Sequence, residues 1–280
     1  MSQVLGEGSI RKMRATLNAG TADYHLPMGD EAVPMNALLG KTLVLSYLGQ
    51  INCIHCNRKT KKSFNQGYCF PCVRKLAQCD NCIVSPQKCH YAAGTCREPE
   101  WGEANCMIDH IVYLANTSGL KVGITRGTQV PTRWIDQGAT QALPMLRVSS
   151  RLDSGLAEVA FAEHVADKTA WQAMLKGANG PLDMPAERAR LLELCTATIE
   201  TLREERGLDA VSFVDEQSVT EIDYPVLEYP EKVKSMTFDK VPEVKGVLKG
   251  IKGQYLLLDT GVINLRRHAG YKVELRVAGS

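Results

Sequence analysis

Short apolar runs separated by turn-forming residues mark both ends of the 280-residue chain. Residues 42–48 read TLVLSYL and follow the turn-prone segment 27–30, a pattern that predicts a strand. The tail from residue 241 has the same character, with apolar runs broken by glycine. Both ends of the chain are therefore predicted to be rich in β-strands.

A second β pattern lies in the middle of the chain. In residues 112–126, VYLANTSGLKVGITR, two apolar runs flank the polar segment 116–119, which ends in glycine. Apolar runs on either side of such a turn predict a β-hairpin.

Helical periodicity is clearest over residues 185–206, where Leu191, Leu194, Cys195, Thr198 and Leu202 recur at helical spacing before Gly207. The following segment, DYPVLEYPEK, is acidic and interrupted by proline. It is expected to be extended, because proline disfavours helix at the residue before it.

The two β-rich ends share a short pattern. DEAVPMN near the N-terminus and DTGVIN in the tail each precede a glycine and then a strand. This similarity indicates a degenerate repeat, or two halves of one small barrel that brings the termini together; two unrelated hairpins are the alternative.

Composition narrows the class of protein. Hydrophobic residues make up 44% of the chain and charged residues 23%, as in ordinary globular proteins. No apolar run approaches the ~18 residues of a membrane helix, and the N-terminus lacks the apolar core of a signal peptide. We expect a cytoplasmic protein with no membrane partner.

The cysteines are concentrated in one segment. Nine of the ten lie between Cys53 and Cys106, and Cys195 lies in the helical pattern, where it is expected to be a small buried residue. Because the cytosol keeps thiols reduced, clustered cysteines there indicate metal binding rather than disulfides.

The spacing predicts two structural zinc sites. Two Cys-x2-Cys knuckles separated by twelve residues suit one tetrahedral Zn²⁺, with ligands Cys53, Cys56, Cys69 and Cys72. A second set would comprise Cys79, Cys82, Cys89 and Cys96. Its later half is not a knuckle, so His90, Cys106 and His110 are possible substitutes. An iron–sulfur cluster, which also takes four thiolates, is the alternative to zinc.

Charge is unevenly distributed although the net charge is only +2. Residues 41–97 hold nine Lys/Arg and one acid, and two four-thiolate zinc sites would reduce this local +8 to +4. Residues 183–243 hold fifteen acids and seven bases, so they offer a surface to a basic protein partner.

Cations and aromatic residues alternate in the first knuckle loop, NRKTKKSFNQGYCFPC. This combination suits phosphate contact and base stacking, although a solvated basic loop has the same composition. The candidate nucleic-acid contacts are Arg58, Lys59, Lys61, Lys62, Phe64 and Tyr68.

The order Tyr113, Lys121-Val122-Gly123, Arg133 and Glu158 resembles the GIY-YIG nuclease superfamily over about residues 108–175. The resemblance implies a mostly antiparallel three-stranded sheet with helices and a metal-dependent endonuclease activity. It also implies that Glu158, or Glu163 as the second choice, binds Mg²⁺ or Mn²⁺.

The expected roles follow from phosphodiester chemistry. Tyr113 or Lys121 would orient or deprotonate water, and Arg133 would hold the phosphate. Lys121 stands where the family usually has tyrosine, and Gln137 stands where many members have His or Tyr. Tyr113 as a core residue and Arg133 as a surface ion-pair partner are the structural alternatives.

The whole layout also resembles an uncharacterised bacterial zinc-binding family of unknown function, on the cysteine segment, SGLKVGITR and IKGQYLLLDTGVIN. The predicted fold class is α+β with several domains. They are a β-rich segment (1–52), a double zinc-binding module (53–106), a GIY-YIG-like domain (107–182), a helix and acidic linker (183–240) and a C-terminal β segment (241–280).

Three functions fit this picture. The first is a zinc-binding endonuclease that acts on nucleic acid, either DNA or RNA. The second is an inactive DNA- or RNA-binding protein that keeps the same fold. The third is a zinc-stabilised scaffold for protein interaction.

Overall fold

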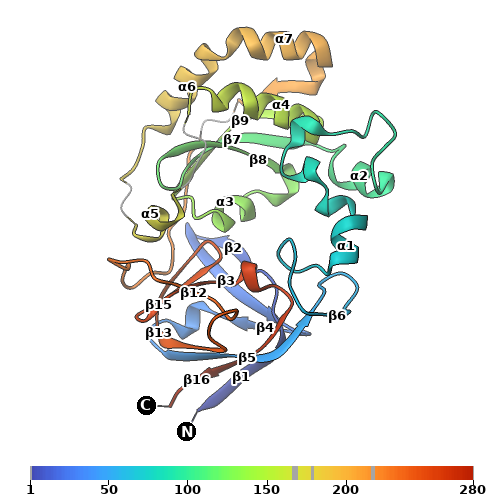
Figure 1. Cartoon of the computed structure of the whole chain (residues 1–280). Helices are drawn as coiled ribbons and strands as arrows, with labels where there is room; N and C mark the ends of the chain where they lie inside the picture. The colour runs from blue at the N-terminus through green and yellow to red at the C-terminus, as the bar shows by residue number, and fades with distance from the viewer. Residues whose placement is uncertain (1, 166–169, 178–179, 216–217, 280) are drawn as a thin grey trace.

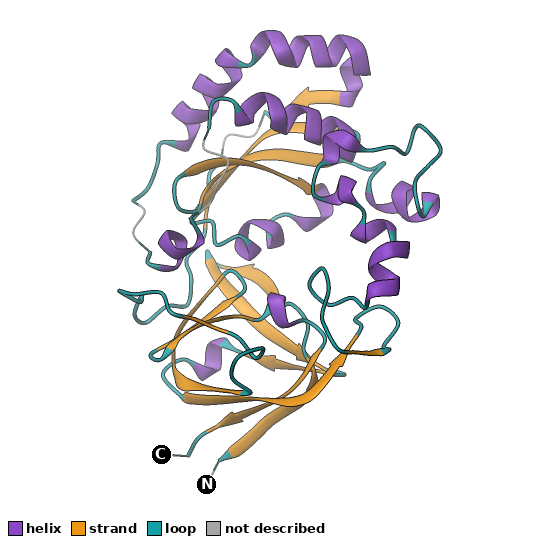
Figure 2. Cartoon of the chain, viewed as in Figure 1, coloured by secondary structure: helices purple, strands orange, loops and turns teal. Residues whose placement is uncertain are grey.

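The computed structural model describes residues 2–165, 170–177, 180–215 and 218–279. Strands from the two ends of the chain lie together, a second layered unit holds the central strands and most helices, and the cysteine-rich segment lies beside both (Figures 1 and 2). The predicted α+β class is confirmed. No helix in the described residues is long and apolar enough to cross a bilayer.

Strands from both ends share one eight-stranded sheet in the described residues. In order, they are β1 (Gln3–Ser9), β16 (Tyr271–Val277), β5 (Thr42–Asn52), β13 (Glu243–Lys252), β14 (Tyr255–Leu258), β15 (Gly261–Asn264) and β12 (Ser235–Met236), with β6 (Lys59–Thr60) paired to β5. The pairs β1–β16, β16–β5 and β5–β13 are antiparallel. The strand predicted over residues 42–48 is confirmed as part of β5.

The suggestion of a small barrel is wrong. Within the described residues the strand path is open, with β1 at one end and β12 at the other. The reason is that the first half places its hairpin in a separate three-stranded sheet instead of extending the long one. That sheet comprises β2 (Arg14–Asn18), β3 (Thr21–Met28) and β4 (Glu31–Pro34). The termini nevertheless lie side by side (Figure 1).

Backbone hydrogen bonds support a repeat rather than two unrelated hairpins. The backbone of Ile10 exchanges two bonds with residues 270–271, and the backbone of Leu248 exchanges two with residues 40–41. The glycine of each pair has a positive φ, 77° for Gly40 and 89° for Gly270. The first strand of each half therefore pairs with the last strand of the other half.

The two halves of the repeat align in structure with an offset of one residue from their alignment in sequence. The Gly29 N–H donates to the Ser9 carbonyl, and the Asp259 N–H donates to the Val247 carbonyl. Gly29 thus corresponds to Asp259 in the structure, whereas the similar sequence patterns DEAVPMN and DTGVIN align Asp30 with Asp259. Backbone geometry, rather than side-chain identity, relates the two halves.

The central sheet has five strands in the described residues, ordered β10 (Val211–Phe213), β9 (Gln141–Val148), β7 (His110–Asn116) and β8 (Leu120–Arg126), with β11 (Thr220–Glu221) beside β9. The predicted hairpin is confirmed as β7–β8. Its three-stranded core β8–β7–β9 is antiparallel, and β10 and β11 extend the sheet beyond the predicted size.

Side chains of β7 alternate between two cores, as the period of a strand requires. Val112 and Leu114 pack with Phe161 and other apolar residues of the helical layer. Tyr113 and Ala115 join the core of the β-rich part of the molecule. The sheet is therefore buried on both faces, and Tyr113 lies between the two parts.

Helices cover one face of this sheet (Figure 1). They are α4 (Arg151–Ala162), α6 (Met184–Leu194) and α7 (Thr196–Arg206). The two short helices α3 (Thr132–Asp136) and α5 (Trp171–Leu175) lie outside this layer. The helix predicted over 185–206 breaks at Cys195, which is buried as expected. Leu191, Cys195, Ile199 and Leu202 form one buried face across the break, while Leu194 is exposed.

The cysteine-rich segment consists of short elements. They are α1 (Phe70–Lys75), η2 (Ala77–Cys79), η3 (Asn81–Ile83), η4 (Pro86–Lys88) and α2 (Pro99–Asn105). Other 3-10 turns are η1 (Asn36–Leu38), η5 (Gly127–Gln129), η6 (Leu208–Ala210) and η7 (Arg266–His268). The segment 223–232 contains no helix, in agreement with the sequence.

Candidate functional site

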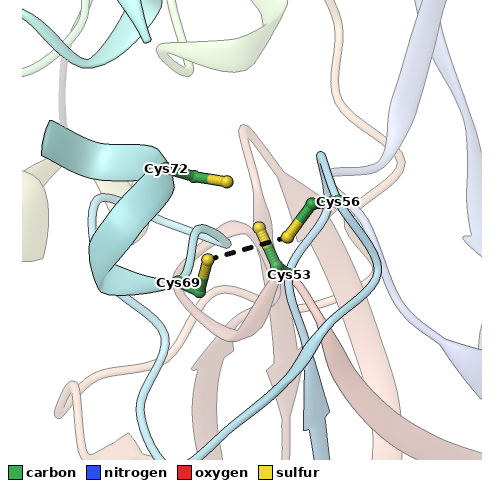
Figure 3. A group of neighbouring side chains, drawn as sticks. All are labelled: Cys53, Cys56, Cys69 and Cys72. Carbon is green, nitrogen blue, oxygen red and sulfur yellow. Dashed lines mark hydrogen bonds between the residues drawn. The ribbon is translucent and has the colours of Figure 1, made fainter. Parts of the chain in front are cut away.

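The first four predicted zinc ligands converge on one point (Figure 3). The Sγ atoms of Cys53, Cys56, Cys69 and Cys72 all lie within 4.8 Å of one another. The Sγ atoms of Cys56 and Cys69 are 3.7 Å apart. A tetrahedron with Zn–S bonds of about 2.3 Å has edges of about 3.8 Å, so the four thiols can hold a zinc-sized ion.

Local backbone geometry builds this site. Asn57, at φ 57°, closes the first knuckle by donating its N–H to the Cys53 carbonyl at 2.9 Å. Burial acts to raise the pKa of Cys53, but backbone N–H groups of Cys56, Cys69 and His55 outweigh it and lower the pKa to about 6. These donors favour a thiolate, which is the form that binds metal.

The second predicted set is only partly brought together. Cys82, Cys89 and Cys96 line a cavity with His90 and Cys106, whereas Cys79 lies outside its lining. Asn65 and Cys53 influence the pKa of the Cys79 thiol, so this thiol lies near the first pair of knuckles. The buried His110 also lies outside this lining, and its Nδ1 is 2.7 Å from the Ile108 carbonyl oxygen.

The basic loop presents its cations to solvent. Arg58, Lys59, Lys61 and Lys62 are exposed, and Phe64 and Tyr68 are half-buried. The Lys62 ammonium lies 5.5 Å from the centre of the Phe64 ring, which is 5.6 Å from the exposed Phe70 ring.

Arg74 extends this surface, with its guanidinium 5.9 Å from the Phe70 ring centre. Phe70 belongs to the predicted aromatic and basic loop, whereas Arg74 was not predicted from sequence. Their spacing of four on α1, which aligns them on one helix face, was the available signal.

Tyr113 occupies the middle of the central sheet, fully buried, opposite Gly123 on β8. A Cβ at position 123 would lie 2.8 Å from the tyrosine hydroxyl, so the glycine makes room for the ring. The hydroxyl donates to Oε1 of Gln137 at 2.8 Å, and the ring contacts Trp134. Burial, the largest cause, raises the pKa of Tyr113 to about 12.

Lys121, Arg133 and Glu158 come from β8, α3 and α4, and the charges of Arg133 and Glu158 act on Lys121. Burial, the largest cause, and the Arg133 charge lower the pKa of Lys121 to about 8 against the opposing charge of Glu158. Charges on Arg133 and Glu158 also influence the pKa of Tyr113. The structure therefore brings the four predicted catalytic residues into one electrostatic neighbourhood.

Glu163, the alternative to Glu158, lies apart from this group. It follows the end of α4 and is exposed, and its charge acts on the Cys195 thiol, which is not part of this group. Asp136, on α3, is already bound by Lys12 at 2.6 Å and by Gln254 at 2.8 Å. The charge of Glu158, unlike that of Glu163, acts on Lys121 and Tyr113, so Glu158 is the one of these two carboxylates that lies beside Lys121 and Arg133.

Two further arginines belong to this neighbourhood, and the sequence did not reveal them. The Arg133 charge acts on both Arg151, at the start of α4, and Arg266, at the start of η7. The Arg266 and Arg11 charges in turn act on Tyr68 of the first knuckle loop. Cations therefore continue from the Lys121 region to the cysteine-rich segment.

This geometry defines the class: an α+β protein with a four-cysteine, metal-type centre and a buried tyrosine beside a half-buried lysine, arginine and glutamate. The family model described as "Protein of unknown function (DUF2797)" matches residues 40–273, so the chain belongs to that family. No curated protein and no solved structure matches the chain.

Proposed function

We propose that the chain is a zinc-binding nucleic-acid hydrolase of the GIY-YIG type. The supporting observation is that the charges of Arg133 and Glu158, from two separate helices, both act on Lys121 and on Tyr113. A cation, a carboxylate and a base near neutral pH are the groups that phosphodiester hydrolysis requires.

Lys121 is the better choice for the base. Its pKa of about 8 leaves a useful neutral fraction at physiological pH, whereas the pKa of Tyr113 is raised to about 12. Tyr113 keeps its proton and positions Gln137 through their hydrogen bond. This assignment gives the lysine the role for which the family usually has tyrosine.

Arg133 would bind the scissile phosphate and neutralise its developing charge. Glu158 is half-buried and can hold Mg²⁺ or Mn²⁺, because Mg²⁺ needs few protein ligands and keeps several waters. When bound, this ion would polarise a phosphate oxygen. Zinc at Cys53, Cys56, Cys69 and Cys72 would be structural, because four thiolates leave no open coordination position.

Substrate binding would extend from the site to the cysteine-rich segment. Arg266 and Arg11 lead from Arg133 toward Tyr68, and the exposed surface of Lys62, Phe64, Phe70 and Arg74 combines cations with aromatic rings. Cations bind the phosphate backbone, and aromatic rings stack on unpaired bases. Single-stranded or distorted nucleic acid is therefore the expected substrate.

The decisive experiment compares cleavage of labelled single-stranded, duplex and branched DNA and RNA with Mg²⁺ and with EDTA. Arg133→Ala and Glu158→Gln should each lower cleavage at least 100-fold. Two variants are the matched controls. Arg147→Ala removes an exposed cation paired with Asp109, and Glu163→Gln changes the next acid along the chain after Glu158, which lies apart from the site. Cleavage that survives Arg133→Ala would refute the site.

An inactive nucleic-acid-binding protein is the second candidate, favoured by the complete burial of Tyr113. It predicts salt-sensitive binding without cleavage for every substrate, because phosphate contacts release counterions. Absence of binding at low salt would contradict both candidates. It would leave the scaffold hypothesis, in which residues 183–243 contact a basic protein.

A further inference from the structure

A cavity in the cysteine-rich segment gathers four thiols that differ from the second predicted set in one member. Cys82 lines it from η3, Cys89 and Cys96 line it from the segment after η4, and Cys106 lines it from the end of α2. Tyr91 and Trp101 complete much of the wall. The sequence gives no knuckle for Cys106 and offered it only as one of three possible substitutes; the fold places it in this cavity instead of Cys79.

The wall is built so that α2 comes close to the cysteines. A Cβ on Gly102 would lie 3.4 Å from the Cys96 Sγ and 3.1 Å from the Tyr91 ring. The Tyr91 hydroxyl also donates to the Glu103 carboxylate at 2.7 Å, which fixes the intervening loop to α2. Loop and helix therefore hold their thiols toward one space.

A half-buried cation, Arg151, lies beside this cavity. The Arg151 guanidinium donates to the Ile83 carbonyl at 2.5 Å, and its buried Nε has no hydrogen-bond partner in the described residues. Its backbone N–H binds the Cys106 carbonyl at 2.7 Å. An anionic centre of metal-bound thiolates beside it would stabilise this cation.

The carboxylate nearest to the cavity is already engaged. Asp80 lies with Cys82 and His90 in a group whose ligand atoms are within 4.8 Å of one another. Its Oδ2, however, accepts from Arg97 at 2.6 Å and lies 3.5 Å from the His90 Nε2. This pairing removes Asp80 from the thiol set and leaves cysteine as the main ligand type.

We propose that Cys82, Cys89, Cys96 and Cys106 form a second four-thiolate metal centre and that Cys79 is not a ligand. Cys89, Cys96 and Cys106 line the cavity without joining any group within 4.8 Å in the described residues, unlike the compact first set. Thiolates around a polynuclear cluster lie further apart than those around one ion, so the cavity favours an iron–sulfur cluster over zinc.

The test is metal and acid-labile sulfide analysis of the full-length protein, purified without oxygen. Wild type should contain one zinc per chain, together with equal amounts of iron and sulfide, and should absorb visible light, which zinc alone does not. Cys106→Ser should lose the iron, the sulfide and the absorption but keep zinc. The matched variant Cys79→Ser should keep all of them, and Cys56→Ser should lose zinc alone.

Retention of iron by Cys106→Ser, or its loss in Cys79→Ser, would overturn the ligand set. A second zinc that Cys106→Ser removes would support the ligand set and overturn the iron–sulfur assignment. Wild type with a single metal ion would overturn both.

If Cys106→Ser fails to fold, loss of its zinc as well would show this. In that case, alkylation of the wild-type protein tests whether Cys106 is a ligand. Cys106 should resist alkylation in the loaded protein and react after the metal is stripped, while Cys79 should not change. Reactive Cys106 in the loaded protein would refute its role as a ligand.

Discussion

A half-buried lysine, Lys121, and a fully buried one, Lys252, have the same lowered pKa in different surroundings. Burial is the largest cause in both, and the pKa falls from 10.5 to about 8 for Lys121 and for Lys252. Lys121 lies among charged groups, Arg133 and Glu158. Lys252, at the end of β13, is 1% exposed, and its ammonium lies 5.1 Å from the Tyr224 ring centre and 5.5 Å from that of Tyr229.

The comparison shows that a shifted pKa alone does not identify a catalytic group. Desolvation lowers the pKa of a buried lysine wherever it occurs. The neighbours differ in what they can do: Arg133 and Glu158 can bind a phosphate and a cation, whereas tyrosine rings stabilise an ammonium by cation–π contact. We therefore assign chemistry to Lys121 and a packing role to Lys252.

Replacement of each lysine by methionine should separate these roles with the largest effect. Lys121→Met should lower kcat/KM for cleavage at least 100-fold, because general-base catalysis contributes ~10²–10⁴-fold. Lys252→Met should change it less than threefold. Lys121→Arg should bind substrate normally but remain inactive, because arginine does not release its proton. Equal activity of the two methionine variants would remove the distinction between the lysines.

Patterns local in sequence predicted much of this molecule. The β7–β8 hairpin, strand β5 and the first cysteine set follow from runs, turns and knuckle spacing that span few residues. Tyr113, Lys121, Arg133 and Glu158 also fall within one short segment, so a family motif was sufficient to nominate them.

Contacts between distant segments could not be predicted in this way. Arg266 reaches the neighbourhood of Arg133 because the last strands of the chain pair with the first ones, a topology that no local pattern encodes. Cys106 enters the second cavity because Gly102 lets α2 approach it. The open sheet in place of a barrel depended on the separate pairing of β2–β4, which is a tertiary choice.

The pH dependence of stability should sharpen the comparison next. The unfolded lysine keeps its proton up to about 10.5, whereas folded Lys252 releases it near 8, so the unfolded state binds more protons between these values. Stability should therefore rise with pH across this window through Lys252, by up to about 3 kcal/mol.

Urea unfolding of wild type and Lys252→Met at pH 7.5 and 9.5 measures this contribution, since Lys121 is present in both proteins and cancels. Wild type should gain stability relative to the variant as the pH rises. Parallel pH profiles would show that Lys252 titrates normally and is not desolvated as the structure indicates.

Removing the hydroxyl of the tyrosine beside each lysine should give the smallest difference, a difference in the free energy of unfolding. Tyr113 acts through its hydroxyl, which donates to Gln137 at 2.8 Å inside the core, whereas Tyr229 presents the face of its ring to Lys252. Tyr113→Phe removes the donor from the half-buried Gln137 amide oxygen and should cost about 1 kcal/mol in the free energy of unfolding. Tyr229→Phe keeps the aromatic face and should change stability by less than about 0.5 kcal/mol. Equal losses for the two variants, measured by urea unfolding at pH 7, would mean that the Tyr113 hydroxyl does not hold Gln137 and that the positioning role proposed for it is incorrect.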